Sequence, residues 1–146
     1  MKRIDKSLGM AFDLFPKYHQ PMSGRYRPYH FAFLYKKNKL VSIGVNSYDP
    51  SPKILYLANR FNVQKYKQYN YAHAETDAIS KAWGKFYLDS SFSFVIIRLN
   101  RFGILQNSKP CANCQSIIDS IGINDVWWST KNCITNGKED YVPVSS

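Results

Sequence analysis

Apolar residues recur at helical spacing in three stretches of the chain, and this period predicts three helices. The stretches cover residues 4–15, 73–86 and 111–120. We expect the first helix to end at Pro16, because proline lacks the backbone N–H that continues a helix. The apolar faces of the other two comprise Ile79, Ala82, Trp83 and Phe86 in the second and Cys114, Ile117, Ile118 and Ile121 in the third.

Runs rich in β-branched and aromatic residues predict five strands. They are His30–Tyr35, Leu40–Val45, Phe92–Leu99, Val126–Ser129 and Tyr141–Val144. The first two are joined by the short polar turn Lys36–Lys39, which predicts an antiparallel hairpin. Asn136-Gly137 is a strong hairpin signal near the end of the chain.

Helices interleaved with strands predict a layered α/β sheet with crossover connections. We interpret residues 1–146 as a single domain, since this length fits one hydrophobic core. Only residues 129–146 follow Trp128, which is too short for the crossover that a parallel final strand needs. The last strand is therefore expected to be antiparallel. Residues 47–72 form a long connection, of the kind that is usually functional or disordered.

Composition indicates a protein of the cell interior. No stretch approaches the roughly 20 apolar residues of a membrane span, and residues 1–6 lack the apolar segment of a signal peptide. The three cysteines do not suggest a disulfide framework, because two belong to the motif described below and only Cys133 is left over. We expect a cytoplasmic location.

The positive charge is concentrated in the first part of the chain. The net charge is +10, and residues 1–60 carry 11 Lys/Arg against 3 Asp/Glu, whereas residues 61–146 carry 9 against 7. Such asymmetry suggests a polyanionic partner. A lysine-rich surface that only keeps the protein in solution explains the charge equally well.

Two short motifs carry the candidate chemistry, His73-Ala74-Glu75 and Pro110-Cys111-Ala112-Asn113-Cys114. One imidazole and two thiolates suit zinc and leave a fourth position open for water. Glu75 is then free to move protons. Two alternatives remain: a redox pair of cysteines, or a closed structural zinc site whose fourth ligand is one of the remaining His and Cys residues, which are His19, His30 and Cys133.

The two motifs open two of the predicted helices. A helix N-terminus carries partial positive charge, which stabilises the thiolate that binds metal. Cys111 and Cys114 are three residues apart, so both sulfurs can face one ion. Pro110 suits a first-turn position, where no N–H is needed.

These motifs resemble those of the zinc-dependent cytidine and deoxycytidylate deaminase superfamily. The resemblance implies a three-layer fold with a central mixed five-stranded sheet and helices on both faces. It implies hydrolytic conversion of cytosine to uracil, with one Zn²⁺ held by His73, Cys111 and Cys114 and with Glu75 moving protons. Further substrate contacts are expected from Asn46, Ala74, Pro110 and Trp128. The superfamily often forms homo-oligomers, and the antiparallel ending resembles the free-cytidine branch with its toxin and editing relatives.

The sequence departs from that branch near Asn46. Free-nucleoside deaminases usually place a glutamate just after this asparagine to hold the ribose, and residues 47–50 contain none. Many of them also ligate the metal by cysteine where this chain has His73. Recognition of a free ribose is therefore in doubt.

Basic and aromatic residues alternate in the first part of the chain and favour single-stranded nucleic acid as substrate. The candidates are Arg25, Arg27, Tyr48, Arg60, Lys65 and Lys67. A free nucleoside or nucleotide is the alternative substrate, because a nucleotide phosphate also attracts arginines and because the tyrosines would equally pack a loop onto the core. A third possibility is a catalytically inactive, zinc-stabilised nucleic-acid-binding module, although such a module has no need of Glu75.

Overall fold

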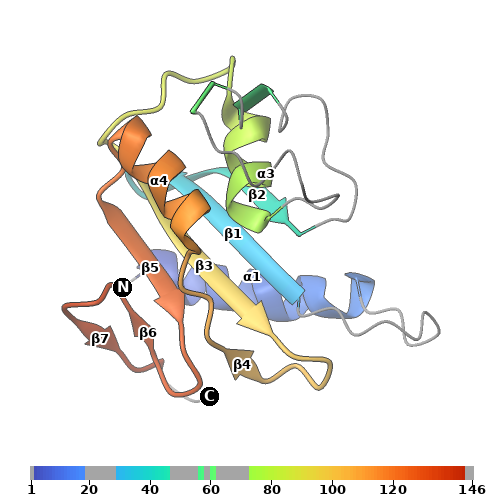
Figure 1. Ribbon diagram of the computed structural model, residues 1–146. Helices are drawn as coiled ribbons and strands as arrows, with labels where there is room; N and C mark the ends of the chain where they lie inside the picture. The colour runs from blue at the N-terminus through green and yellow to red at the C-terminus, as the bar shows by residue number, and fades with distance from the viewer. Residues whose placement is uncertain (1, 19–28, 47–55, 58–59, 62–72, 144–146) are drawn as a thin grey trace.

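The computed structural model describes residues 2–18, 29–46, 56–57, 60–61 and 73–143 (Figure 1). Three helices and seven strands follow one another along these residues. They are α1 (Lys2–Tyr18), β1 (Tyr29–Lys36), β2 (Lys39–Val45), α3 (Ala74–Ala82), β3 (Phe92–Leu99), β4 (Leu105–Gln106), α4 (Ala112–Ile121), β5 (Asp125–Ser129), β6 (Ile134–Thr135) and β7 (Asp140–Tyr141). None of the described helices is both long and apolar enough to cross a membrane.

The strands form one mixed sheet in the order β2-β1-β3-β5-β6-β7, with β4 also paired to β3. β3 and β5 run parallel and are connected through α4, whereas the other pairs are antiparallel. The mixed sheet is as expected, but the count of five strands was wrong. The sequence missed β4 and β6, because a two-residue strand is too short to show an alternating pattern.

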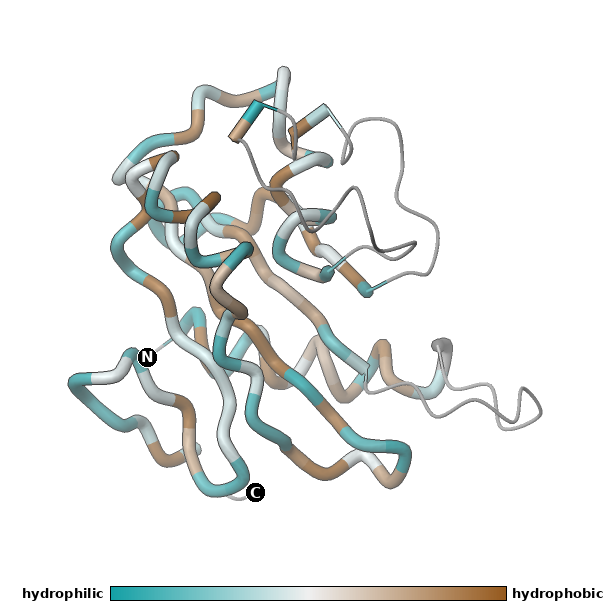
Figure 2. Tube along the Cα trace, in the orientation of Figure 1, coloured by the Kyte–Doolittle hydropathy of each residue, from teal (hydrophilic) through white to brown (hydrophobic). Residues whose placement is uncertain are grey.

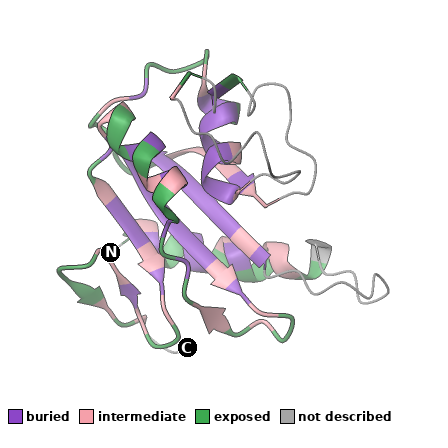
Figure 3. Ribbon diagram, viewed as in Figure 1, coloured by how far each residue is buried: buried purple, intermediate pink, exposed green. Residues whose placement is uncertain are grey.

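Helices cover both faces of the sheet, as Figure 1 shows: α3 and α4 lie in front of it and α1 lies behind. The alternation along β1 explains this arrangement. Phe31, Phe33 and Tyr35 pack with α1 in one buried cluster, and Ala32 and Leu34 pack with α3 and α4 in the other. The central strands are buried on both sides (Figure 3). Figure 2 shows hydrophobic segments along the central strands and a hydrophilic turn between β6 and β7.

Both predicted hairpins are present. Lys36 pairs with Lys39 across the first turn, and Lys37 takes a left-handed conformation with φ of 55°. At the second, Gly137 has φ of 90°, and Asn136 Oδ1 accepts hydrogen bonds from the backbone N–H groups of Lys138 and Glu139. The expected antiparallel ending is confirmed, although the last strand covers Asp140–Tyr141 rather than Tyr141–Val144.

Two helix ends differ from the expectation. α1 continues through Pro16 to Tyr18, because a proline near the end of a helix removes only one of the last intrahelical hydrogen bonds. α3 ends at Ala82 instead of reaching residue 86. Trp83 already has an extended backbone and Gly84 has φ of 90°, so the chain turns out of the helix there. Phe86 is consequently exposed rather than part of the buried helical face.

Candidate metal and catalytic site

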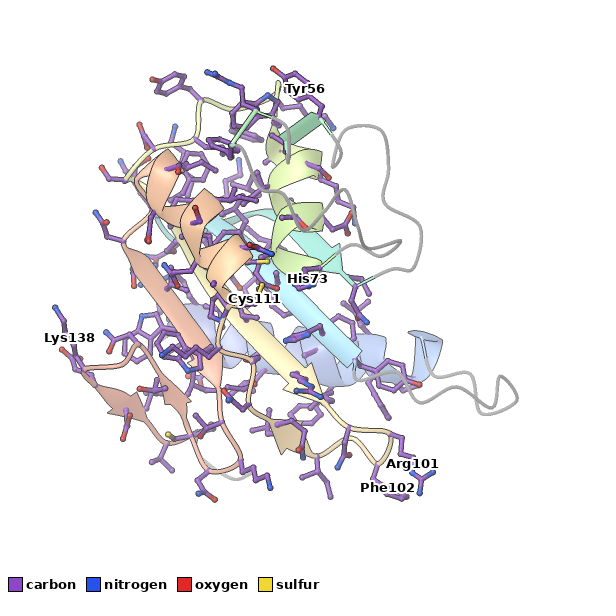
Figure 4. All side chains as sticks on the ribbon, viewed as in Figure 1. Tyr56, His73, Arg101, Phe102, Cys111 and Lys138 are labelled. Carbon is purple, nitrogen blue, oxygen red and sulfur yellow. The ribbon has the colours of Figure 1, made fainter. Side chains whose placement is uncertain are left out.

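His73, Cys111 and Cys114 come together between the N-terminal ends of α3 and α4 (Figure 4). His73 Nδ1 lies 3.5 Å from Cys111 Sγ and 3.4 Å from Cys114 Sγ. The three ligand atoms all lie within 4.8 Å of one another. The two motifs, which are far apart in sequence, therefore form one cluster.

Each motif starts its helix through a capping residue. His73 is the N-cap of α3, and its carbonyl oxygen accepts from Asp77 N and Thr76 Oγ1, both at 3.0 Å. Cys111 is the N-cap of α4, and its carbonyl oxygen accepts from Gln115 N at 2.8 Å. The helix starts were expected, and they place the ligands where helix dipoles favour negative charge.

The start of α3 is held tightly against β2 because Gly44 has no side chain. A Cβ atom on Gly44 would lie 1.9 Å from the carbonyl oxygen of Ala74. Asp77 Oδ2 accepts from Val45 N at 2.9 Å, and Ser42 Oγ donates to Ala78 O at 2.8 Å. The position of His73 and Glu75 therefore depends on the close approach at Gly44.

The loop that leads into Cys111 is held by two buried serines, which the sequence did not reveal. Ser108 Oγ donates to Ile96 O at 2.8 Å and accepts from Ser129 N at 2.8 Å. Ser129 Oγ in turn donates to Gln106 O at 2.7 Å. These bonds join the loop to β3 and β5 just beyond the last parallel pair of those strands. Isolated serines carry no hydropathy signal, so only the fold shows their positioning role.

The spacing of the three ligand atoms suits zinc. Tetrahedral zinc with bonds of about 2.0 Å to nitrogen and about 2.3 Å to sulfur places nitrogen and sulfur roughly 3.5 Å apart. The two observed separations of 3.5 and 3.4 Å agree with that value. Among the other candidate ligands, His30 and Cys133 are not part of the cluster, and His19 lies outside the described residues. Within the described part of the chain the cluster thus offers a His-Cys-Cys donor set, which would leave a fourth position open on a bound ion.

The electrostatics of the cluster favour the thiolate of Cys111. The pKa of Cys111 is lowered to about 3, mainly by a hydrogen bond with Cys114. Burial acts in the opposite direction and raises this pKa, whereas a hydrogen bond with His73 lowers it further. Burial alone would lower the pKa of His73, but the Cys111 thiolate outweighs it and raises that pKa above its usual value. A thiolate is the form that binds a metal ion.

Glu75 is buried beside these ligands without full hydrogen bonding. Its side chain is 3% exposed, and Oε1 finds no hydrogen-bond partner among the described residues. Burial raises the pKa of Glu75 above its ordinary value, so the carboxyl group takes up a proton more readily. A buried polar atom without a partner is costly and is expected to face a ligand or water.

Asn46 and Trp128, two of the expected substrate contacts, lie on the sheet face that carries the cluster. Asn46 Oδ1 accepts from His30 N at 3.1 Å, so this side chain also fastens the end of β2 to β1. Trp128 packs in the cluster formed with α3 and α4, with Lys109 Nζ 5.8 Å from its ring centroid. Trp127 points to the opposite face and packs with α1, as the alternation along a strand requires.

Ala74 and Pro110, the other two expected contacts, are buried next to the ligands. Ala74 is the first residue of α3, directly after His73, and Pro110 directly precedes Cys111. The structure therefore brings all four expected substrate contacts to the face of the sheet or the helix starts where the metal ligands lie.

Most of the expected nucleic-acid contacts fall outside the described residues, namely Arg25, Arg27, Tyr48, Lys65 and Lys67. Arg60 is described and exposed. Arg60 lines a pocket together with Trp83, which caps the C-terminal end of α3. His73 caps the opposite, N-terminal end of the same helix. Arg60 is thus not brought to the ligand cluster.

Comparison with solved structures gives a relationship of fold. No protein-family model matches the sequence, and no curated protein matches it. The 1.6 Å crystal structure of cytidine deaminase from Burkholderia pseudomallei matches with a TM-score of 0.52. The alignment covers 97% of this chain and 91% of that chain at 17% sequence identity. The expected three-layer, cytidine-deaminase-like fold is therefore confirmed.

Proposed function

We propose that this chain is a zinc-dependent hydrolase that removes the exocyclic amine of a cytosine base to give uracil. One observation carries the proposal. An imidazole and two sulfurs at zinc spacing stand beside a buried carboxyl group that has an unpaired oxygen. The similarity of the fold to that of a cytidine deaminase supports it.

His73, Cys111 and Cys114 would hold the ion, with one position open. A zinc ion held there would supply Lewis acidity and lower the pKa of water at the open position to about 7. Glu75 takes a proton from the attacking water and delivers it to the ring nitrogen of the base. The hydroxyl group adds to the carbon that bears the amine. Glu75 then transfers the remaining proton of the added hydroxyl group to the amine, the carbon–nitrogen bond breaks as the carbonyl group forms, and ammonia departs.

The placement of Glu75 argues against a purely structural zinc site. A structural site is usually closed by four protein ligands, and three are brought together among the described residues. A buried carboxyl group with an unpaired oxygen costs stability. Such a cost is typical of residues kept for chemistry, so a zinc-stabilised binding module without turnover explains the site less well.

The substrate that we favour is a cytosine within single-stranded nucleic acid. Support comes from the net charge of +10 and from the absence of a glutamate in residues 47–50. The tip of the β3–β4 hairpin adds to it, because Phe102 is 69% exposed and Arg101 lies over its ring at 4.7 Å. Exposed aromatic and cationic side chains together form the platform on which unpaired bases stack. A free nucleotide is the alternative substrate.

The direct test is a deamination assay on the zinc-loaded protein. Cytidine, deoxycytidine, deoxycytidylate, single-stranded DNA and single-stranded RNA are incubated in parallel, and uracil-containing product is read by mass. We expect product that disappears in the Glu75→Gln protein while zinc remains bound. Glu139→Gln, which alters an exposed carboxylate far from the cluster in sequence, is the matched control and should leave the rate unchanged. Stoichiometric zinc without product from any substrate would refute the proposal and favour the binding module.

A further inference from the structure

Four polar side chains cross the sheet in one row on the face that carries the metal ligands. Antiparallel pairing places His30 opposite Arg98, and Arg98 opposite Gln106. Asn46 N donates to His30 O at 3.4 Å, which continues the row onto the end of β2. In β1 and β3 the residues two and four positions away along the strand, such as Ala32 and Ile96, pack against α3 and α4. By the alternation of strands, His30 and Arg98 face the same side.

Within this row, His30 is the imidazole whose electrostatic neighbours include both Arg98 and the ligand cluster. Burial, together with the charges of Arg98 and His73, lowers the pKa of His30 to about 4, so its imidazole is neutral near pH 7. His30 Nε2 is buried and has no hydrogen-bond partner among the described residues. The ring accordingly presents an unused polar atom on the face where a substrate would approach.

Arg98 is a partly buried guanidinium that lacks an anion. Its Nε is buried and finds no partner among the described residues, and its Nη1 donates to Asn107 O at 3.3 Å. No described carboxylate forms an ion pair with it. A buried guanidinium nitrogen without an acceptor is unfavourable, whereas a phosphate accepts from two guanidinium nitrogens at once.

We propose that Arg98, assisted by His30, binds a phosphate group attached to the nucleoside whose base enters the metal site. This inference rests on the proposed function and names its substrate class: a phosphorylated cytosine nucleoside rather than a free one. The phosphate belongs either to a mononucleotide or to the backbone of a single strand. The sequence did not mark this subsite, because His30 and Arg98 are distant in sequence and only the pairing of β1 with β3 joins them.

The neighbouring hairpin tip distinguishes the two sources of phosphate. β3 continues from Arg98 into this tip, where Phe102 is exposed and Arg101 covers its ring. A strand that continues beyond the bound phosphate would stack a neighbouring base on Phe102, which is worth roughly ten-fold in affinity. A mononucleotide ends before reaching it.

The test uses the zinc-loaded Glu75→Gln protein, which retains the ligands but should not turn over. Its affinity is measured for cytidine, cytidine 3′- and 5′-monophosphate and a short cytosine-containing oligonucleotide. We expect at least one phosphorylated form to bind about ten- to a hundred-fold more tightly than cytidine, as hydrogen bonds to charged groups allow. Adding Arg98→Gln should remove that advantage and leave cytidine binding unchanged, whereas Arg98→Lys should retain part of it. Arg101→Gln, an equal change of charge at an exposed site, is the control with mononucleotides.

The inference is overturned if no phosphorylated form binds more tightly than cytidine, or if the advantage persists in the Arg98→Gln protein with its zinc and folding intact. Loss of oligonucleotide affinity in a Phe102→Ala variant assigns the phosphate to a single strand, and unchanged affinity assigns it to a mononucleotide. The wild-type protein separates the two claims. Deamination of free cytidine, together with an affinity for the phosphorylated forms that Arg98→Gln does not lower, would refute the subsite alone. Arg98-dependent phosphate binding without deamination of any substrate would refute the proposed function alone.

Discussion

Replacing Ser108 by alanine tests whether the buried serine pair holds the second metal motif in place. Ser108 is 1% exposed, and its hydroxyl group forms several hydrogen bonds. Its hydroxyl donates to Ile96 O at 2.8 Å, accepts from Ser129 N at 2.8 Å and lies 2.9 Å from Ser129 Oγ. Alanine retains the Cβ atom, so the change removes the hydroxyl with little change in volume.

The size of the effect follows from the groups left without partners. Ser129 N–H loses the acceptor shown in the structure and stays buried, which costs about 1–3 kcal/mol. Ile96 O loses a donor, and a carbonyl group tolerates this better because it has a second lone pair. Ser129 Oγ keeps its bond to Gln106 O. The expected loss is thus about 2–4 kcal/mol in the free energy of unfolding.

The assay is chemical denaturation of the metal-free protein, followed by a competition measurement of zinc affinity. We expect Ser108→Ala to lower both, because the loop from Ser108 leads into Pro110 and Cys111. Ser120→Ala is the matched control, since Ser120 is exposed and its hydroxyl group donates within α4, to Ser116 O. The control should change stability by less than about 0.5 kcal/mol. If Ser108→Ala behaves like Ser120→Ala in both measurements, the positioning role is wrong.

Three further predictions address other parts of the structure. Gly44→Ala should cost about 1–3 kcal/mol in unfolding free energy and weaken zinc binding, because the new Cβ meets the start of α3. The control is Gly9→Ala, whose new Cβ enters open space and should lower neither stability nor zinc affinity. Equal losses in the two variants would contradict the close approach at Gly44. Cys114→Ser should lower zinc affinity at least ten-fold, whereas the Cys133→Ser protein should still contain one zinc per chain by elemental analysis. Loss of zinc from the Cys133→Ser protein, with zinc retained in Cys114→Ser, would assign Cys133 as the ligand in place of Cys114. The pKa of His30 is lowered from 6.5 to about 4, so its neutral form contributes stability that is present above pH 6.5 and lost as pH falls toward 4. His30→Gln should remove about 3 kcal/mol of that pH-dependent loss in denaturation curves, and an unchanged pH profile would show that burial does not suppress the charge.

The parts of the fold that the sequence predicted are those with a clear local pattern. β3 covers the range predicted for it, because a continuous run of apolar residues with high β-propensity is typical of a buried strand. The helix over residues 73–86 was too long because its apolar period continues to Phe86, although Gly84 turns the backbone out of the helix. Two-residue strands depend on pairing between distant segments, which no local pattern contains.

The same distinction holds for the site. His73, Cys111 and Cys114 were predicted to converge because the chemistry of the ligands demands it, and the structure brings them together. Ser108, Ser129 and Arg98 could not be found in this way. Their roles follow from which strands pair and in which register, which is a property of the folded sheet.

The open zinc site with Glu75 beside it is the central claim, and X-ray absorption at the zinc edge of the purified protein tests it most directly. The expected coordination is two sulfurs at about 2.3 Å, one imidazole nitrogen at about 2.0 Å and one oxygen from water. The same ligands should persist in the Glu75→Gln protein, because Glu75 does not bind the metal. A third sulfur, a second imidazole, or a change of coordination on replacing Glu75 would contradict the account.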